Sequence, residues 1–131
     1  MFQIGDFIND NNEVVKIIGI HSKNHQINTD KHGLIRPCSP NITLNKEVLS
    51  SCGFTLNPSS GLYEIKLKNG NVVSCTVGQS GVISNLTICC PFYKHHDDIG
   101  VLSILQDIIR DKTGEELPID IPALQKSQNS K

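Results

Sequence analysis

Residues 98–117 constrain the fold more than any other stretch, because they carry the pattern of one long amphipathic helix. Val101, Ile104, Leu105 and Ile108 recur at spacings of three and four residues, which places them on one helical face. A face this apolar has to be covered, so we expect the helix to lie across a sheet. The predicted exposed side consists of Gln106, Asp107, Arg110 and Asp111.

The predicted long helix has end signals that agree with its apolar pattern. Asp97 or Asp98 is suited to the N-cap, where a carboxylate also interacts well with the positive end of the helix dipole. Gly114 is suited to the left-handed position after the last turn, and Pro118 prevents continuation. We therefore expect the helix to end before residue 118.

The N-terminal part of the chain predicts a small antiparallel sheet. Residues 2–9 and 13–20 are predicted strands, the second of them rich in β-branched side chains. The polar residues 10–12 between them are typical of a hairpin turn. Weaker strand patterns occupy residues 25–29 and 34–37. Short strands joined by tight turns favour a curled, SH3-like sheet.

A short helix with complete capping signals follows this sheet. Asn45 is suited to the N-cap of a helix over residues 46–52, and Gly53 to the left-handed position after its end. Phe54 can then pack back on Leu49. These apolar positions, and Cys52 with them, are predicted to belong to the core.

Three further strands, over residues 62–68, 71–77 and 82–90, predict an antiparallel meander. Asn69 and Gly70 favour a type I′ turn between the first two. The fold class is therefore α+β: a small antiparallel, curled (SH3-like) N-terminal sheet, a short helix, and then a three-stranded antiparallel meander covered by one long C-terminal helix.

The chain of 131 residues has the length of a single domain. We expect this domain to span residues 1–120, with a sub-boundary in the polar loop near 56–61. Residues 121–131 are polar and short of apolar side chains, so they predict a flexible tail.

The charge of the chain disfavours nucleic acid as a partner. The net charge is −1, and there is no Trp, with only four Phe and two Tyr. Nucleic-acid-binding proteins need a basic surface, and many use aromatic side chains to stack bases. Acidic side chains gather in residues 97–120, which carry seven acidic and two basic residues. That segment is expected to be a solvated helix face, or else a surface for a basic partner.

The cysteines show no metal-binding or redox spacing, and the sequence contains no signal-peptide-like or membrane-spanning stretch. We therefore expect reduced cysteines in a protein of the cytoplasm, without membrane association. The five cysteines are Cys38, Cys52, Cys75, Cys89 and Cys90.

The densest group of functional side chains lies in residues 91–98, between the last predicted strand and the long helix. The candidate ligand-binding residues are Arg36, Tyr93, Lys94, His95 and His96, which together offer cations and one aromatic ring. Neighbouring histidines rarely converge on one ion, so we expect no metal site. Two other interpretations are an anion site at the helix N-terminus and a capped helix entry with exposed histidines.

No catalytic motif is present. The sequence has no nucleophile elbow, no phosphate-binding glycine loop and no dinucleotide fingerprint. The paired carboxylates, Asp97–Asp98 and Glu115–Glu116, lie at the ends of the predicted helix, where the helix dipole and caps explain them. We therefore expect no catalytic residues and no cofactor.

Several stretches together resemble a known group of proteins. They are Ile-Gly-Asp-Phe-Ile at residues 4–8, the strand at 14–20, the helix at 44–54 ending in Cys-Gly-Phe, and Leu105-Gln106 with Thr-Gly-Glu-Glu-Leu at 113–117. Over about residues 2–118 the chain resembles small uncharacterised proteins of gut Bacteroidales phages, prophages and mobile elements. Ser103 stands at a position where proteins of that group often have His. The resemblance implies an origin and no specific activity.

The leading hypothesis is a non-enzymatic phage or mobile-element accessory protein that acts by binding in the cytoplasm of a bacterial host. It would sequester a signalling nucleotide, as a homo-oligomer, or inhibit a host defence protein. The alternative is a nucleic-acid- or protein-interaction module on the N-terminal SH3-like sheet, using Lys16, Lys23, Lys31 and Arg36. The third hypothesis is a small Cys/His-dependent enzyme.

Overall fold

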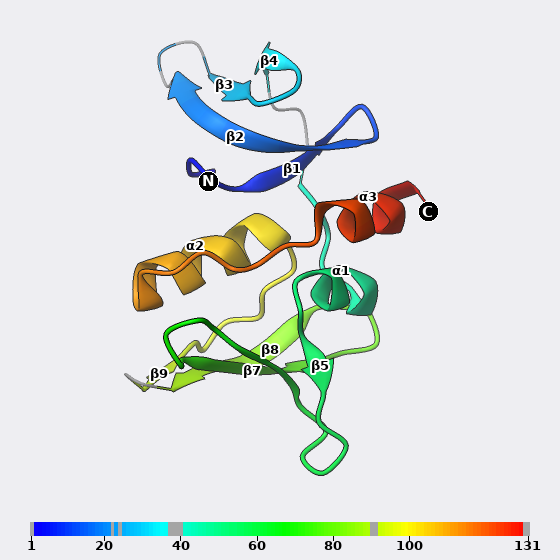
Figure 1. Cartoon of the computed structure of the whole chain (residues 1–131), viewed down its shortest axis with the longest axis vertical. Coiled ribbons are helices and arrows are strands. Elements are labelled where there is room, and N and C mark those ends of the chain that lie inside the picture. Colours follow the sequence, from blue (N-terminus) through cyan, green and yellow to red (C-terminus); the bar gives the residue numbers. More distant parts are fainter. Residues whose placement is uncertain (1, 22, 24, 37–40, 90–91, 130–131) are drawn as a thin grey trace.

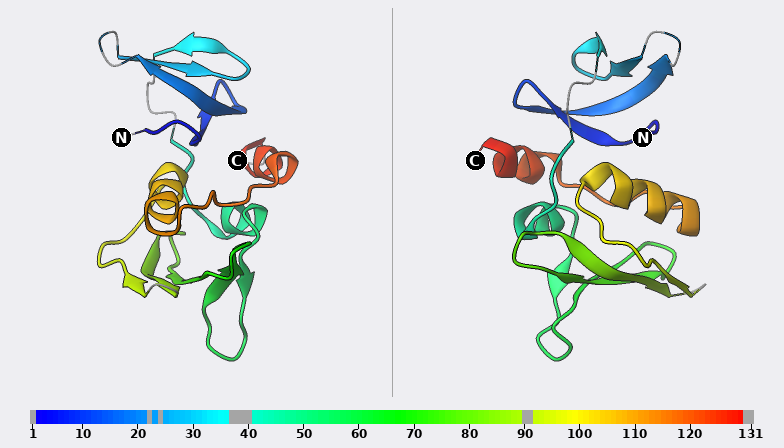
Figure 2. Two further views of the ribbon diagram at one scale, coloured as in Figure 1. Left: turned by 60° about the vertical axis from the view of Figure 1, so that its left-hand side comes forward. Right: turned by 180° about the vertical axis from the view of Figure 1, so that it is seen from behind.

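The computed structural model describes residues 2–21, 23, 25–36, 41–89 and 92–129. Within these residues the protein is an α+β structure of two antiparallel sheets and three helices. The helices lie between the sheets, one sheet on each side of them (Figure 1). The same layering is seen from two further directions (Figure 2). The predicted α+β class is therefore confirmed.

The N-terminal sheet has four strands in sequential order. The β1–β2 hairpin closes over Asn11 and Asn12, which both have positive φ (51° and 67°). Such two-residue loops match the twist of the flanking strands, and asparagine tolerates this backbone better than most residues. A register shift between Ile17 and Gly19 marks a bulge in β2. The strands are β1 (Phe7–Asp10), β2 (Glu13–His21), β3 (Gln26–Thr29) and β4 (Gly33–Ile35).

The C-terminal sheet has five described strands where the sequence predicted three, because β5 and β9 add to its edges. Gly70 lies in the left-handed region (φ 97°), but Asn69 does not. The predicted type I′ turn is therefore wrong. The loop contains three residues, closed by the Leu67 N–H donating to the Asn71 carbonyl (2.7 Å). The strands are β5 (Thr55–Leu56), β6 (Tyr63–Lys66), β7 (Val72–Val77), β8 (Ile83–Cys89) and β9 (Tyr93–Lys94).

The short helix α1 (Lys46–Ser51) has the predicted caps. The Asn45 side chain accepts a hydrogen bond from the Val48 N–H (2.8 Å). After the last turn the Phe54 N–H donates to the Leu49 carbonyl, across a glycine with positive φ. This is the Schellman arrangement, which satisfies carbonyls that the helix end leaves open.

The long helix α2 (Leu102–Thr113) begins four residues later than predicted. Neither Asp97 nor Asp98 is its N-cap, because the N-cap is Val101 and carries no side-chain cap bond. Ile99 and Val101 are extended instead and form isolated bridges to Ile83 and Thr43. Pairing with the C-terminal sheet therefore outcompetes the capping preference of the two aspartates. The predicted end is confirmed, since Gly114 has φ 74°.

The buried face of α2 also differs from the prediction. Ile104 is 41 % exposed, whereas Gln106 is 2 % exposed. The prediction assumed one sheet on one side of the helix. The helix lies between two sheets, so it buries a second side, which carries Gln106. Its buried residues are Leu102, Ser103, Leu105, Gln106 and Ile109.

The predicted flexible tail is wrong for most of its length, because Ile121–Asn129 form helix α3. Leu124 is fully buried, and Ser127 and Gln128 are buried beside it. The helix contacts α1 and β2, so the tertiary partners order a segment whose composition alone is too polar to fold. Positions 130–131 lie outside the described residues.

Two apolar clusters hold the layers together. The main core joins the C-terminal sheet to the helices and includes Phe7 and Val14 from the N-terminal sheet. A second, small core inside the N-terminal sheet consists of Ile8, Val15, Ile17 and Ile27. Neighbouring side chains alternate between the two cores, so residues 7–8 of β1 and 14–15 of β2 are buried on opposite faces of the sheet. Among the described residues, no helix has the length and apolar run needed to cross a membrane.

Candidate functional site

The five predicted ligand-binding residues do not meet within one chain. Arg36 directly follows β4, in the N-terminal sheet, and is exposed. Tyr93 and Lys94 form β9 in the C-terminal sheet, and His95 and His96 follow them. The helix layer separates β4 from β9 (Figure 1). A single pocket lined by all five residues is therefore absent from the described part of the chain.

Four of those residues form a small group at the edge of the C-terminal sheet, in which Lys94 and His96 are exposed and Tyr93 and His95 are half-buried. The Tyr93 hydroxyl lies 2.8 Å from His95 Nδ1, and Lys112 Nζ lies 4.6 Å from the centre of the Tyr93 ring. A cation over a tyrosine ring is a favourable contact. Because α2 begins at Leu102, His95 and His96 do not adjoin its N-terminus, and the predicted anion site there is not formed.

Two of the three described cysteines are buried. Burial raises the pKa of the Cys52 thiol to about 12 and that of Cys75 to about 11. A thiol must ionise before it attacks, so these two are poor nucleophiles and pack as core residues. Cys89 is exposed on β8. Cys38 and Cys90 lie outside the described residues. The described residues also contain no group of three His, Cys, Asp or Glu side chains able to hold a metal ion.

Exposed aliphatic side chains gather in the N-terminal sheet and the segment before it. Of the eight large hydrophobic side chains exposed among the described residues, four lie there. Leu34 is 53 % exposed and Ile18 is 48 % exposed. The other two are Ile4 and Ile20. A cluster of this kind on a small sheet is informative, because scattered single exposures are the usual pattern on soluble proteins.

The strand register places Ile18 and Leu34 on one face. Ile27 is buried in the small core, so its neighbour Asn28 points the other way. Gly19 and Leu34 are the cross-strand partners of Asn28 and share its face. The bulge keeps Ile18 beside Gly19 on that side. We call Ile18, Asn28 and Leu34 the outer face. Gly19, the cross-strand partner of Asn28, adds no side chain to this face.

One end of the same sheet is cationic. Pairing of Ile20 with Ile27, and of Ile27 with Ile35, brings the end of β2, the start of β3 and the end of β4 together. No carboxylate occurs in residues 14–29 or 31–36. We call the side chains at this position the cationic end. They are His21, Lys23, His25 and Arg36.

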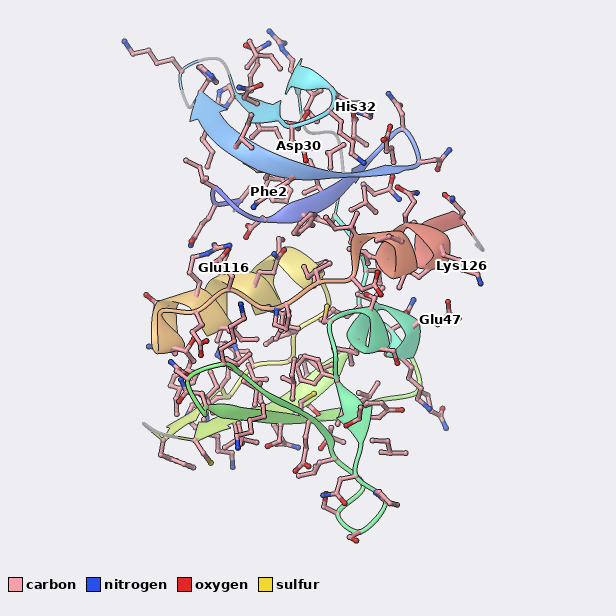
Figure 3. The ribbon with its side chains drawn as sticks, in the orientation of Figure 1. Phe2, Asp30, His32, Glu47, Glu116 and Lys126 are labelled. Atoms are coloured by element: carbon pink, nitrogen blue, oxygen red, sulfur yellow. The ribbon has the colours of Figure 1, made fainter. Side chains whose placement is uncertain are left out.

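The opposite end of the sheet carries acidic residues, and a histidine joins its two turns. His32 Nδ1 lies 2.7 Å from Asp10 Oδ2, and His32 Nε2 lies 2.9 Å from Glu13 Oε1. Hydrogen bonds to these carboxylates raise the pKa of His32. The bonds tie the β3–β4 turn to the β1–β2 turn, and Figure 3 labels His32 beside Asp30 in this sheet.

A glutamine of α2 holds the strand β1. The Gln106 side-chain oxygen accepts from the Phe7 N–H (2.9 Å), and its amide donates to the Gly5 carbonyl (3.2 Å). The amide therefore pairs with alternate backbone groups of the chain, as a neighbouring strand would. The apolar pattern of α2 predicts Gln106 on the exposed side of the helix, and this prediction is wrong because Gln106 is buried.

A glutamine of α3 repeats this arrangement at β2. The Gln125 side-chain oxygen accepts from the Val14 N–H (2.6 Å), and its amide donates to the Asn12 carbonyl (2.8 Å). One turn further on, Gln128 accepts from the Asn9 side chain (3.2 Å). These contacts have no local sequence signal, because the partners lie more than a hundred residues apart in the chain.

A charged cluster completes the contact between the N-terminal segment and α2. The Arg110 guanidinium donates to the carboxylates of Asp6 (3.3 Å), Asp107 (3.1 Å) and Glu116 (2.9 Å). Burial and the hydrogen bond with Asp107 raise the pKa of Asp6 to about 7, against the opposing effects of the Gln3 N–H and Arg110. Arg110 lowers the pKa of Glu116, which lies beside α2 facing the N-terminal sheet (Figure 3).

The chain was compared with protein families, curated proteins and solved structures. No protein-family model, no curated protein and no solved structure matches the chain.

Proposed function

We propose that the protein is non-enzymatic and acts by binding a protein partner through the outer face of its N-terminal sheet. The observation that carries the proposal is the exposure of Ile18 and Leu34 on one face, with Asn28 between them. Keeping aliphatic side chains in water is unfavourable, and such groups commonly mark contact surfaces. The cationic end adjoins this face, so a partner bound there would also lie close to Lys23 and Arg36.

The proposal includes an SH3-like character for this sheet. Four short antiparallel strands, the bulge in β2 and a small core separate from the main core support it. A sheet with its own core can present a binding face without depending on the rest of the molecule for its shape.

The resemblance to phage and mobile-element proteins gives the proposed partner its class. We propose a bacterial host protein, bound and inhibited in the host cytoplasm. Sequestration of a nucleotide is the weaker version, because it needs Arg36 in one lining with Tyr93, Lys94, His95 and His96. Arg36 lies on the other side of the helix layer.

Site-specific photo-crosslinking tests the proposal. A photoreactive phenylalanine analogue replaces Asn28 in the outer face, and in a control chain it replaces Leu56, which is exposed on β5. Both chains are expressed in a bacterial host and irradiated. We expect a discrete heterologous adduct from position 28 and none from position 56, with mass spectrometry identifying the captured protein.

A second variant tests whether the adduct depends on the surface. Leu34→Ser combined with the analogue at position 28 should abolish the adduct, while Ile121→Ser, a change at another exposed aliphatic position, should not. Equal adducts from positions 28 and 56, or an adduct that survives Leu34→Ser, would refute the proposed surface. Circular dichroism confirms that each variant remains folded.

A further inference from the structure

We infer that the partner presents an extended acidic segment, in which an aliphatic residue contacts the outer face and a carboxylate two residues away contacts Arg36. The inference rests on the proposed function and adds the chemistry of the ligand. It is carried by the charge pattern of β2 to β4 and by the strand repeat that relates Leu34 to Arg36.

The first step is the segregation of charge along the sheet. All three exposed or partly exposed carboxylates of residues 7–36 lie at the turn end, where each already has a partner. Asp30 accepts a hydrogen bond from the Lys16 N–H (3.0 Å), and His32 bridges Asp10 and Glu13. All three carboxylates of the turn end are therefore already hydrogen-bonded within the sheet.

The cationic end lacks this compensation. Within the described part of the chain, neither Lys23 nor Arg36 forms an ion pair, whereas Lys31 pairs with Glu13 (3.4 Å). Two fixed positive charges thus remain next to exposed aliphatic side chains. A ligand that covers the aliphatic side chains gains most if it brings carboxylates to the two cations.

The spacing follows from the strand repeat. Leu34 faces outwards in β4, and Arg36 lies two residues further along the chain. Two residues of extended chain span about 7 Å, and they return to the same face. A partner segment in extended conformation repeats at the same distance, so an aliphatic-x-acidic pattern matches Leu34 and Arg36.

A protein segment fits these features better than nucleic acid. Residues 13–36 contain no Phe, Tyr or Trp, so the surface offers no ring on which a base can stack. The two uncompensated cations would neutralise few phosphates, which gives little of the counterion release that drives nucleic-acid binding. The aliphatic part of the surface would also stay uncovered.

Titrations of ¹⁵N-labelled protein with designed probes test the inference. The probes are a peptide of Leu-Ser-Glu-Ser repeats, the same peptide with Gln for Glu, the same with Lys for Glu, and a DNA duplex. We expect the acidic peptide to shift amide resonances of residues 18–36 at the lowest concentration. Replacing Glu by Gln should weaken binding about fivefold to tenfold, as expected for the loss of two partly exposed ion pairs.

Charge variants complete the test. Lys23→Gln with Arg36→Gln should weaken acidic-peptide binding about fivefold to tenfold, whereas Lys66→Gln with Lys68→Gln, on the β6–β7 hairpin, should leave it unchanged. Equal binding of the Glu and Gln peptides, or tighter binding of DNA, overturns the inference. If the Gln peptide binds the outer face as tightly as the Glu peptide and Leu34→Ser abolishes the binding of both, the inference fails while the proposed function stands. If no peptide shifts residues 18–36, the inference fails, and the photo-crosslinking result alone decides the proposed function.

Discussion

The two sheets are held in different ways. The C-terminal sheet buries fully apolar side chains, such as Val73, Leu86 and Ile88, in a core shared with the helices. The N-terminal sheet has only a small core of its own, around Ile17 and Ile27. Apolar burial is the dominant stabilising contribution in folding, so we expect the C-terminal region to be the more stable of the two.

The contact between the N-terminal sheet and the helices is largely polar. Gln106 and Gln125 bind backbone groups of the strands, and Arg110 gathers Asp6 with two other carboxylates. Phe7 and Val14 are the buried apolar side chains that the described part of the N-terminal sheet contributes to the main core. Polar contacts inside one chain are typical of parts that can move relative to each other. The N-terminal sheet is therefore the region whose position depends on a few replaceable hydrogen bonds.

Truncation of core side chains is expected to have the largest effect on the stability of the two sheets. Leu105→Ala, in the main core, should lower the free energy of unfolding by about 2–5 kcal/mol, because a fully buried aliphatic side chain is replaced by a cavity. Ile27→Ala, in the small core, should act mainly on the N-terminal sheet. Hydrogen exchange followed by mass spectrometry distinguishes the two effects.

We expect Leu105→Ala to speed exchange in both sheets, and Ile27→Ala to speed it in residues 7–35 while the C-terminal sheet keeps its protection. Ile104→Ala, at a 41 % exposed position on the same helix, is the matched control and should change little. Uniformly faster exchange in Ile27→Ala would mean that the two regions unfold as one cooperative unit.

Removal of one glutamine tests how much the polar contact between α2 and β1 contributes to stability. Gln106→Leu keeps the size of the side chain but leaves the Phe7 N–H and the Gly5 carbonyl without this partner. Leaving a buried backbone group unsatisfied costs about 1–3 kcal/mol. We expect urea denaturation to show a loss of this size, with faster hydrogen exchange at β1. Gln125 is less buried than Gln106, so Gln125→Leu should reduce the free energy of unfolding by less. Equal losses would show that burial does not set the cost of removing these hydrogen bonds.

A pH series tests the charged cluster around Asp6. The pKa of Asp6 rises from 3.8 to about 7 on folding, so the folded state holds a proton that the unfolded state releases. The stability from this proton is fully present below pH 3.8 and is lost as pH rises to about 7. Asp6→Asn should therefore remove a decline in stability that the unmodified protein shows as pH rises from 3.8 to about 7.

The measurement is urea denaturation at each pH, with Asp111→Asn as the control, because Asp111 is exposed on the same helix. An unchanged decline in Asp6→Asn would show that a group other than Asp6 holds the proton. A decline lost in both variants would indicate a general effect of net charge.

Local signals in the sequence predicted part of this fold well. The helix α1 matches because its signals are short-range: Asn45 caps Val48, and Phe54 closes back on Leu49. The β1–β2 hairpin also follows from adjacent residues. Such features depend on groups within a few positions of each other, and the sequence displays them directly.

Long-range contacts account for what could not be predicted. The start of α2 moved because Val101 pairs with Thr43, and the tail is helical because Leu124 enters the main core. Gln106 was assigned to solvent because a helical pattern does not reveal that a second sheet covers the helix. The candidate site residues were grouped by residue type, and the topology places Arg36 after β4 and His95 after β9, at different sheets of the same chain.

The smallest expected effect concerns the turn end of the N-terminal sheet. His32 donates to Asp10 and Glu13, and these bonds raise its pKa above 6.5. A raised histidine pKa means that the stabilisation is complete below the unfolded value and is lost as pH rises through the folded one. NMR titration of the His32 ring should show the raised pKa directly. Asp10→Asn and Glu13→Gln should each lower it.

The control for the histidine titration is Asp30→Asn, which removes a nearby carboxylate that hydrogen-bonds the Lys16 N–H and makes no bond to His32. We expect this variant to lower the pKa of His32 less than either Asp10→Asn or Glu13→Gln. Loss of the bridge should also speed hydrogen exchange at the β3–β4 turn above the histidine pKa, while the C-terminal sheet stays protected. If the exchange of both sheets changes together, the bridge stabilises the whole chain, and the N-terminal sheet is less independent than its small core indicates.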